Sequence, residues 1–267
     1  YRQALDEFAG AAAEGWLDAV RRFRRREILR IGTRDICLGL PVAGVTRDLS
    51  CLAEAVTGAV LDGVCQRRGT WARGLADGLC VMAFGKLGGN ELNYSSDIDL
   101  FGVFDAGALD LPEPEAAHQY SRVMEHLRAA LSDHTAAGYA YRVDYRLRPH
   151  GRAGGLAQSV ATATAYYRRE AAMWEVQALL KLRPVAGNLR VGRRFIVGLE
   201  DLLRARRDPQ AVWASIRHVR ARAVRCQGMT ANEDVKSGVG GIRDVEFLVQ
   251  GLQLVHLHRH GELLAGN

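Results

Sequence analysis

The chain has 267 residues, 48% of them hydrophobic and 25% charged, with a formal net charge of +6. This composition is that of a globular protein with room for a sizeable core, or for one compact domain flanked by a second. The longest apolar runs, such as residues 79–84, are far too short to cross a bilayer, which excludes a membrane-spanning protein. The five cysteines form no CxxC pair, so we expect buried, reduced thiols and no zinc site.

The first 77 residues are predicted to be a helical segment. Leu17, Val20 and Phe23 recur at helical spacing, and arginines fill the positions around them from 21 to 26. We interpret these arginines as the solvated face of an amphipathic helix. Because the chain begins with Tyr1 and shows no leader pattern, we also interpret it as a piece of a longer protein.

Residues 78–185 are predicted to form an α+β catalytic core, a small mixed sheet with helices. Residues 79–84 are expected to be a buried strand, followed by a glycine-rich turn, a second strand over 96–104 and a helix over 116–137. Residues 139–147 alternate between apolar and polar side chains, which predicts a further strand. Its polar face carries Arg142, Asp144, Arg146 and Arg148.

Residues 186–267 are predicted to return to helix and to form a C-terminal bundle segment. Val212, Ile216, Val219, Ala223 and Cys226 recur at helical spacing. A glycine-rich break over 236–241 precedes a second apolar helical pattern over 245–255. The sequence therefore predicts a helix-rich protein in which helical segments flank one catalytic core.

Three aspartates are the candidate catalytic and metal-binding residues. Asp97 and Asp99 stand two apart on a predicted strand, so both carboxylates project from one face, and Asp144 adds a third from the polar face of another strand. Carboxylates held side by side repel each other unless a cation lies between them, and hard oxygen ligands suit Mg²⁺ or Mn²⁺. Three carboxylates are enough to hold two metal ions that bridge a phosphate.

The glycine-rich turn before these aspartates is the candidate phosphate-binding element. Small residues there let the backbone approach a triphosphate closely. The pattern resembles the signature of the nucleotidyltransferase superfamily, in which an apolar residue, glycine and a small residue precede two acids by about ten residues. Lys86 departs from that pattern, because the superfamily often has serine or glycine at this position. The residues assigned to the nucleotide and its phosphates are Gly85, Lys86, Gly88, Gly89, Ser96, Arg146 and Arg148.

Four sequence blocks that occur in the same order point to one family within this superfamily. Residues 85–100, 141–152, 174–187 and 240–250 are very similar to motifs of the glutamine synthetase adenylyltransferase and adenylyl-removing family. The resemblance implies one nucleotidyltransferase half of a multifunctional cytoplasmic enzyme of nitrogen metabolism. That half transfers an adenylyl group from ATP to a tyrosine of glutamine synthetase, or removes it by phosphorolysis with phosphate to give ADP. It also implies two Mg²⁺ ions and a PII-type regulatory partner of the full-length enzyme, and it leaves the direction of the reaction open.

The remaining charged residues allow more than one interpretation. Lys181 and Arg183 are possible phosphate ligands, although Lys181 could equally pair with Glu175. Arg146 and Arg148 could instead be partners of the aspartates. Asp244 and Glu246 open a helix after the glycine-rich break, where they either cap the helix or reach the active site.

Two other functions remain as alternatives. The basic charge balance also fits a nucleotidyltransferase that acts on nucleic acid, although we find no aromatic and basic RNA-binding module. A non-catalytic fragment that binds nucleotide or a partner protein is the other alternative. The four-block match argues against the first alternative, and the three intact aspartates argue against the second.

Overall fold

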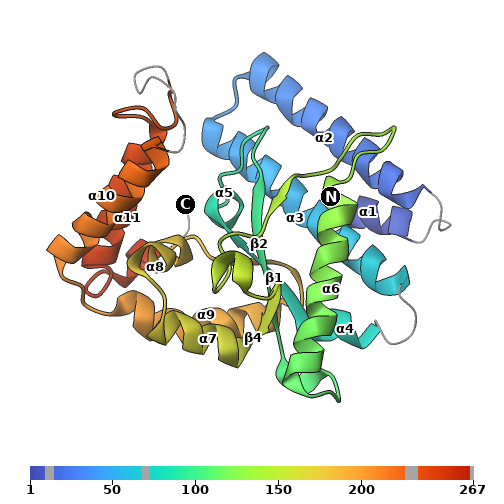
Figure 1. Cartoon of the computed structure of the whole chain (residues 1–267). Helices are drawn as coiled ribbons and strands as arrows, with labels where there is room; N and C mark the ends of the chain where they lie inside the picture. The colour runs from blue at the N-terminus through green and yellow to red at the C-terminus, as the bar shows by residue number, and fades with distance from the viewer. Residues whose placement is uncertain (10–14, 68–72, 226–233, 265–267) are drawn as a thin grey trace. The chain divides into compact units, whose positions relative to one another are not determined.

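The computed structural model describes residues 1–9, 15–67, 73–225 and 234–264 (Figure 1). The chain forms two compact units. The first comprises Tyr1–Tyr166 and Lys181–Val197, and the second comprises Tyr167–Leu180 and Gly198–Gly266. The first unit thus contains both the predicted N-terminal helical segment and most of the predicted catalytic core. The three-segment division at residues 77 and 185 stays a prediction.

In the first unit, helices surround a small mixed sheet, which confirms the predicted α+β class. Its helices are α1 (Arg2–Ala9), α2 (Trp16–Leu38), α3 (Val42–Arg67), α4 (Arg73–Gly78), α5 (Gly85–Gly88), α6 (Glu113–Ser132), most of α7 (Val160–Arg169) and the beginning of α9 (Leu189–Arg204). Its strands are β1 (Leu79–Phe84), β2 (Ile98–Phe104), β3 (Val143–Asp144), β4 (Ala157–Ser159) and β5 (Arg183–Gly187).

The sheet has the order β3-β2-β1-β5. Strand β4 also pairs with β2, further along that strand than β3 does. Strand β1 lies between β2 and β5 and is antiparallel to both. All six of its side chains are buried, as expected for a central strand made of an unbroken apolar run. Strand β2 is parallel to both β3 and β4, so it brings the segment around residue 144 next to the centre of the sheet.

Helices α3 and α6 cover one face of the sheet. Alternate residues of the strands, such as Val81, Ala83 and Leu100, share a core with the buried side chains of these helices. On the other face, a Cβ added to Gly192 of α9 would lie 2.6 Å from the Cys80 sulfur and 2.9 Å from that of Met82. The first turns of α9 therefore pack closely against the sheet, which has apolar cover on both sides.

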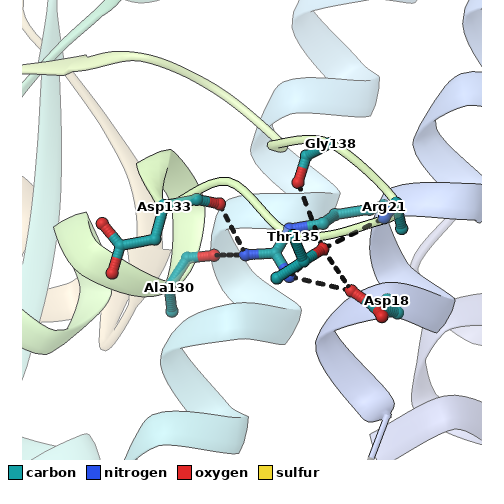
Figure 2. A network of polar contacts seen from close by, with 7 residues as sticks. Asp18, Arg21, Ala130, Asp133, Thr135 and Gly138 are labelled. Atoms are coloured by element: carbon teal, nitrogen blue, oxygen red, sulfur yellow. Dashed lines mark hydrogen bonds and ion pairs between the residues drawn. The ribbon is translucent and has the colours of Figure 1, made fainter.

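A buried arginine of α2 fixes the end of α6 (Figure 2). Arg21 is only 2% exposed, and it donates to the carbonyl oxygens of Ala130 (3.2 Å) and Asp133 (3.0 Å). It also donates to the side chains of Asp18 and Thr135. The last carbonyls of a helix have no partner within the helix and attract a cation, so Arg21 satisfies groups that would otherwise be buried without a bond. The expected solvated face is therefore wrong for Arg21, although Arg22, Arg25 and Arg26 are exposed.

The second unit is helical. It contains α8 (Met173–Leu179), the end of α9 from Gly198, α10 (Pro209–Arg225) and α11 (Ile242–His256). A Cβ at Gly251 would lie 2.4 Å from the ring of Trp213, so α10 and α11 approach closely at this glycine. The buried side chains of Gln177 and Gln250 bond to each other at 2.6 Å and link α8 to α11. Both predicted helices of this region are present, and Cys226 lies outside the described residues.

Several predicted boundaries need correction. The second strand begins at Ile98 rather than at residue 96, and the helix predicted over 116–137 is α6, which ends at Ser132. The strand predicted over 139–147 is wrong except for its two central residues, Val143–Asp144. The alternation there has another cause: Tyr141 and Tyr145 are buried, and the Tyr145 hydroxyl donates to the Met124 carbonyl at 2.7 Å. Among the described residues, none of the helices has the length and apolar content that crossing a membrane requires.

Candidate active site

The glycine-rich turn directly follows the central strand and lies against one of the aspartates. Gly85 begins the short helix α5 and has a φ of +55°, a conformation that favours glycine. A Cβ at this position would also lie 2.7 Å from Oδ2 of Asp99. Both the backbone and the space around it therefore require glycine. Its absence of a side chain lets the Asp99 carboxylate sit directly on the turn.

The end of the turn is held by close packing and by an arginine. A Cβ at Gly88 would lie 1.9 Å from the carbonyl oxygen of Lys181, so no other residue fits there without a backbone shift. Arg183 donates to the carbonyl oxygens of Leu87 (2.9 Å) and Gly88 (3.2 Å), and it also bonds to Glu54 of α3 at 2.8 Å. In this structure the Arg183 side chain therefore positions the turn, while its predicted phosphate contact stays a prediction.

Two of the three aspartates are direct neighbours across the sheet. Asp99 of β2 and Asp144 of β3 are register partners on parallel strands, and Phe84 is the partner of Asp99 on the other side. The Ile98 amide donates to the Arg142 carbonyl at 3.0 Å and fixes this register. Asp97 lies just before β2, where its side chain is half exposed. The sheet thus brings two acids of the predicted trio together beside the glycine-rich turn, and the convergence of all three stays a prediction.

Each of two aspartates is paired with an arginine. The Arg142 guanidinium donates to the Asp97 carboxylate, to the Tyr139 hydroxyl at 3.2 Å and to the Ser95 carbonyl at 2.9 Å. Arg146 donates through Nε to the Asp144 carboxylate at 2.7 Å, and its backbone amide donates to the same carboxylate at 2.8 Å. Two roles were considered for Arg146, phosphate binding and partnership with an aspartate. The contact observed is the partnership with Asp144.

The electrostatics of the site follow from these pairs. Burial raises the pKa of Asp144, but the hydrogen bonds and charge of Arg146 outweigh burial and leave the pKa below its ordinary value. The pKa of Arg146 is raised, first by its hydrogen bond to Asp144 and then by that carboxylate's charge. The charges of Asp99 and Asp97 raise it further. The Arg146 guanidinium therefore lies within electrostatic reach of all three acids.

Arg148 has a different position from the other arginines of its segment. Its side chain is buried and donates to the carbonyl oxygens of Gly154 (2.9 Å), Tyr145 (2.5 Å) and Arg152 (3.1 Å). These bonds hold together the turn that follows β3. Its predicted contact with a phosphate stays a prediction, and the structure gives this side chain a role in the turn.

The two lysines of the site, Lys86 and Lys181, differ in their contacts. Lys86 lies on α5 with a partly exposed side chain, and its carbonyl accepts the Glu91 amide at 2.8 Å. Lys181 forms an ion pair with Glu91, and a Cβ at Gly89 would touch both members of that pair. Gly89 therefore leaves room for the Lys181–Glu91 contact. The predicted phosphate contacts of Lys86, Gly89 and Lys181 stay predictions.

Ser96, the last of the predicted phosphate ligands, lies in the loop before β2. Its hydroxyl donates to the side chain of Asn93. Glu175, the alternative partner considered for Lys181, accepts the Ala172 amide at 2.9 Å and so caps the beginning of α8. Both side chains thus have local bonds that fix the loops around them.

Asp244 and Glu246 belong to the second unit, on α11. Both oxygens of Asp244 accept from Arg220 of α10, at 2.6 and 2.8 Å, and one also accepts the Gly240 amide at 2.9 Å. These bonds lower the pKa of Asp244, with the Arg220 hydrogen bond as the main cause. Glu246 accepts from Gln250 at 3.4 Å. Asp244 therefore joins two helices and supports the start of α11, and a role of either acid in catalysis stays a prediction.

The fit of a metal ion rests on the donor set. Within the described ranges, no three His, Cys, Asp or Glu side chains are arranged closely enough to hold an ion. In the same site, Arg142 and Arg146 hold the carboxylates of Asp97 and Asp144. The chemistry of the donors nevertheless fits a hard divalent cation, since Asp99 and Asp144 are adjacent carboxylates on rigid strands.

Arg142 is the residue that sequence reasoning missed. It was placed on the polar face of a predicted strand but was not assigned to the site. The signal was present, since Arg142 lies two residues before Asp144, as Arg146 lies two residues after it. A residue at that spacing on the same segment as a candidate catalytic acid is a candidate for the same site.

Comparisons with known proteins agree over most of the chain. The model of the family described as glutamate-ammonia ligase adenylyltransferase matches residues 1–197, and that of GlnD PII-uridylyltransferase matches residues 210–267. A bifunctional glutamine synthetase adenylyltransferase/adenylyl-removing enzyme of Streptomyces coelicolor is 36% identical over 95% of the chain. Proteins with the same description from Streptomyces avermitilis and Neisseria meningitidis serogroup B are 37% and 35% identical over 98% and 96% of the chain. The matches cover 26%, 26% and 28% of these relatives, so the chain spans about a quarter of their length.

Proposed function

The chain belongs to the glutamate-ammonia ligase adenylyltransferase family, and from this premise we propose that it is an enzyme with one nucleotidyltransferase site. The site moves an adenylyl group between an adenine nucleotide and a tyrosine of glutamine synthetase. The descriptions of the relatives support both the group and the target protein. The tyrosine and the regulation of nitrogen assimilation are parts of the proposal that follow from the sequence resemblance.

One observation carries the proposal. Asp99 and Asp144 are register partners on parallel strands, and the Asp99 carboxylate lies against Gly85 at the beginning of the glycine-rich turn. A pair of acids beside a glycine-rich turn is suited to hold a polyphosphate through a divalent cation.

Asp97, Asp99 and Asp144 would hold the divalent cations, two Mg²⁺ or Mn²⁺ ions. When bound, such ions neutralise charge on phosphate oxygens and stabilise the attacking and leaving oxygens of an in-line displacement. The rigid sheet contributes the positions of Asp99 and Asp144, because their backbones are fixed by the ladder between β2 and β3. Gly85 and Gly88 let the Asp99 carboxylate and the Lys181 carbonyl lie directly against the turn, and we propose that the turn so shaped binds the nucleotide phosphates.

The same residues serve both directions of the proposed reaction. In adenylylation, the tyrosine oxygen forms a bond to the α-phosphorus of ATP, the bond from that phosphorus to the β-phosphate oxygen breaks, and the phenolic proton leaves to solvent. In removal, an oxygen of hydrogen phosphate forms a bond to the adenylyl phosphorus, the bond from that phosphorus to the tyrosine oxygen breaks, ADP leaves, and the tyrosine oxygen takes up the proton of the phosphate. Lys86, Gly89 and Ser96 are proposed to bind the nucleotide phosphates in both cases, with Arg146 as a mobile cation.

The partners are part of the same proposal. Glutamine synthetase is the substrate that the relatives' descriptions imply. A PII-type regulatory protein is proposed as a partner of the full-length enzyme, loosely supported by the match of residues 210–267 to a PII-uridylyltransferase model. We also propose that the enzyme works in the cytoplasm, where glutamine synthetase and free thiols such as Cys80 are expected.

One assay tests the function and its direction. The chain is incubated with unmodified glutamine synthetase and ATP, or with adenylylated glutamine synthetase and phosphate, and the mass of the target tyrosine peptide is measured. We expect a gain of one adenylyl group in the first reaction or its loss in the second, and neither with the Asp99→Asn variant. No change in either mixture, or equal activity of the variant, would refute the proposed site.

A further inference from the structure

The arginines of the two site pairs are more exposed than those of the Arg183–Glu54 and Arg220–Asp244 pairs, whose arginine side chains are 30% and 33% exposed. The side chains of Arg142 and Arg146 are 56% and 69% exposed, whereas that of Asp144 is 17% exposed. Arg146 is therefore much more exposed than its acid, and the Arg142–Asp97 pair is open on both sides, since Asp97 is 50% exposed. Exposed ion pairs contribute little to stability, so a competing cation can break them at small cost.

The backbones of the two arginines are fixed while their heads are not. The Arg142 carbonyl accepts the Ile98 amide at 3.0 Å, and the Arg146 amide donates to the Asp144 side chain at 2.8 Å. A long side chain on a fixed backbone can exchange one anionic partner for another within its reach. A carboxylate and a phosphate that bind the same metal ion are close enough together for one arginine side chain to reach either of them.

The charges of the site point in the same direction. Without metal, the carboxylates of Asp97 and Asp144 are each neutralised by one guanidinium. Two divalent cations added to the same acids would leave an excess of positive charge. A polyphosphate arriving with the cations would remove this excess, and the arginines displaced from the acids would be beside its oxygens. Guanidinium groups bind phosphate as well as carboxylate, often through two parallel hydrogen bonds.

We propose that Arg142 and Arg146 occupy the metal-binding carboxylates in the empty site and transfer to the nucleotide phosphates when metal and nucleotide bind. The inference rests on the proposed function, and it assigns to Arg142 a role in nucleotide binding. It accounts for the absence of an assembled metal site among the residues described. It makes the arginines competitors of the metal in the empty site and ligands of the substrate in the loaded one.

The test measures two affinities on the same set of variants. Mn²⁺ alone is titrated into the protein by electron paramagnetic resonance, and the α,β-methylene analogue of ATP is titrated by calorimetry with saturating Mn²⁺. The variants are Arg142→Ala, Arg146→Ala and Arg152→Ala. Arg152 is the matched control, because its charge acts on Asp144 through space while its side chain is exposed. Its loss therefore reports the general effect of removing one nearby positive charge.

We expect Arg142→Ala and Arg146→Ala to bind Mn²⁺ alone about fivefold more tightly than the wild type, since a competing ion pair is gone. The same variants should bind the nucleotide analogue at least about tenfold more weakly, since a charge-assisted hydrogen bond is lost. Arg152→Ala should change either affinity by no more than about twofold. Arg142→Lys and Arg146→Lys should lie between wild type and alanine in nucleotide affinity, because a lysine keeps the charge without the planar group.

Other results would overturn the inference. Tighter Mn²⁺ binding with unchanged nucleotide affinity would mean that the arginines only compete and do not transfer. Effects equal to those of Arg152→Ala would mean a general charge effect, and a lower melting temperature with both affinities unchanged would mean a structural role. If the wild type bound the analogue with Mn²⁺ but the alanine variants did too, only this inference would fail. If the wild type bound neither, the proposed function would fail first.

Discussion

The protein uses arginine in two regions for opposite purposes. In the first unit, Arg21 of α2 is buried and donates to backbone carbonyls at the end of α6, with Asp18 and Thr135 beside it (Figure 2). In the site, Arg142 and Arg146 are exposed and rest on carboxylates. The chemical group is the same in the two regions, but the partners and the degree of burial differ.

The difference teaches which arginines are permanent and which are exchangeable. A carbonyl oxygen at a helix end is always present and has no other partner, so removing Arg21 leaves buried acceptors without a bond. The arginines of the site are exposed, and another cation can replace them on the acids. Burial and partner type together thus separate a structural arginine from one that can move during function.

The largest effect is expected from the aspartates themselves. We expect Asp99→Asn to lower the rate of adenylyl transfer by about 10³-fold or more, since metal stabilisation of the reaction is worth several kcal/mol. The melting temperature without metal should hold or rise, because one of several like charges disappears. Steady-state rates with Mg²⁺ and a thermal melt of the same preparation check both parts. Wild-type activity of this variant would contradict the assignment of the acid.

The buried arginine gives the next effect, on stability rather than on rate. Arg21→Ala should lower the free energy of unfolding by about 3 kcal/mol, because it leaves the Ala130 and Asp133 carbonyls unpaired. Arg22→Ala, at the exposed neighbouring position, is the matched control and should stay within about 0.5 kcal/mol. Urea unfolding of both variants decides. If the two variants lost equal stability, the buried bonds of Arg21 would not matter.

Lys86 tests the site from the side of the glycine-rich turn. If it binds phosphate, Lys86→Ala should weaken ATP or ADP binding by about 1.5–3 kcal/mol, the contribution of a charge-assisted hydrogen bond. The melting temperature without nucleotide should change little. Calorimetric titration of nucleotide beside a thermal melt separates this role from a structural one. A lower melting temperature with normal nucleotide affinity would make Lys86 a structural residue.

The smallest effect concerns pH. The pKa of Asp144 is lowered in the folded state because Arg146 outweighs burial. Its stabilising contribution is therefore present above the pKa of an unfolded aspartate, near 3.9, and is lost as the pH falls through the folded value. Without metal, the stability difference between wild type and Asp144→Asn should shrink by up to about 1 kcal/mol between about pH 6 and about pH 2. Denaturant melts at several pH values measure it, and a difference that grows towards acid would contradict the sign.

The local sequence pattern was sufficient to predict the central strand of the sheet. An unbroken apolar run ending in glycine predicts β1 to the residue, Leu79–Phe84, because a central strand must be apolar on both faces. The glycine-rich turn and Asp99 likewise lie against each other as their spacing suggests, while the role of these residues as a site stays a prediction. Both signals lie within about twenty residues of sequence, where chain geometry leaves few alternatives.

Contacts between residues far apart in the sequence could not be predicted from the sequence pattern. The segment over 139–147 alternates like a strand, yet only Val143–Asp144 join the sheet, because Tyr145 is fixed by the carbonyl of Met124, which belongs to α6. Arg148 alternates with the polar residues but turns inward to three carbonyls. Arg21 finds its partners more than a hundred positions away. A pattern along the chain reports which side a residue faces, and not which distant acceptor it meets.

A crystal structure with Mn²⁺ and the α,β-methylene analogue of ATP tests the central claim most directly, because manganese can be located by its anomalous scattering. The account predicts manganese between Asp99 and Asp144, with the guanidinium groups of Arg142 and Arg146 moved from the carboxylates to within hydrogen-bond distance of phosphate oxygens. Manganese and nucleotide bound elsewhere, with both arginines still on their aspartates, would contradict it.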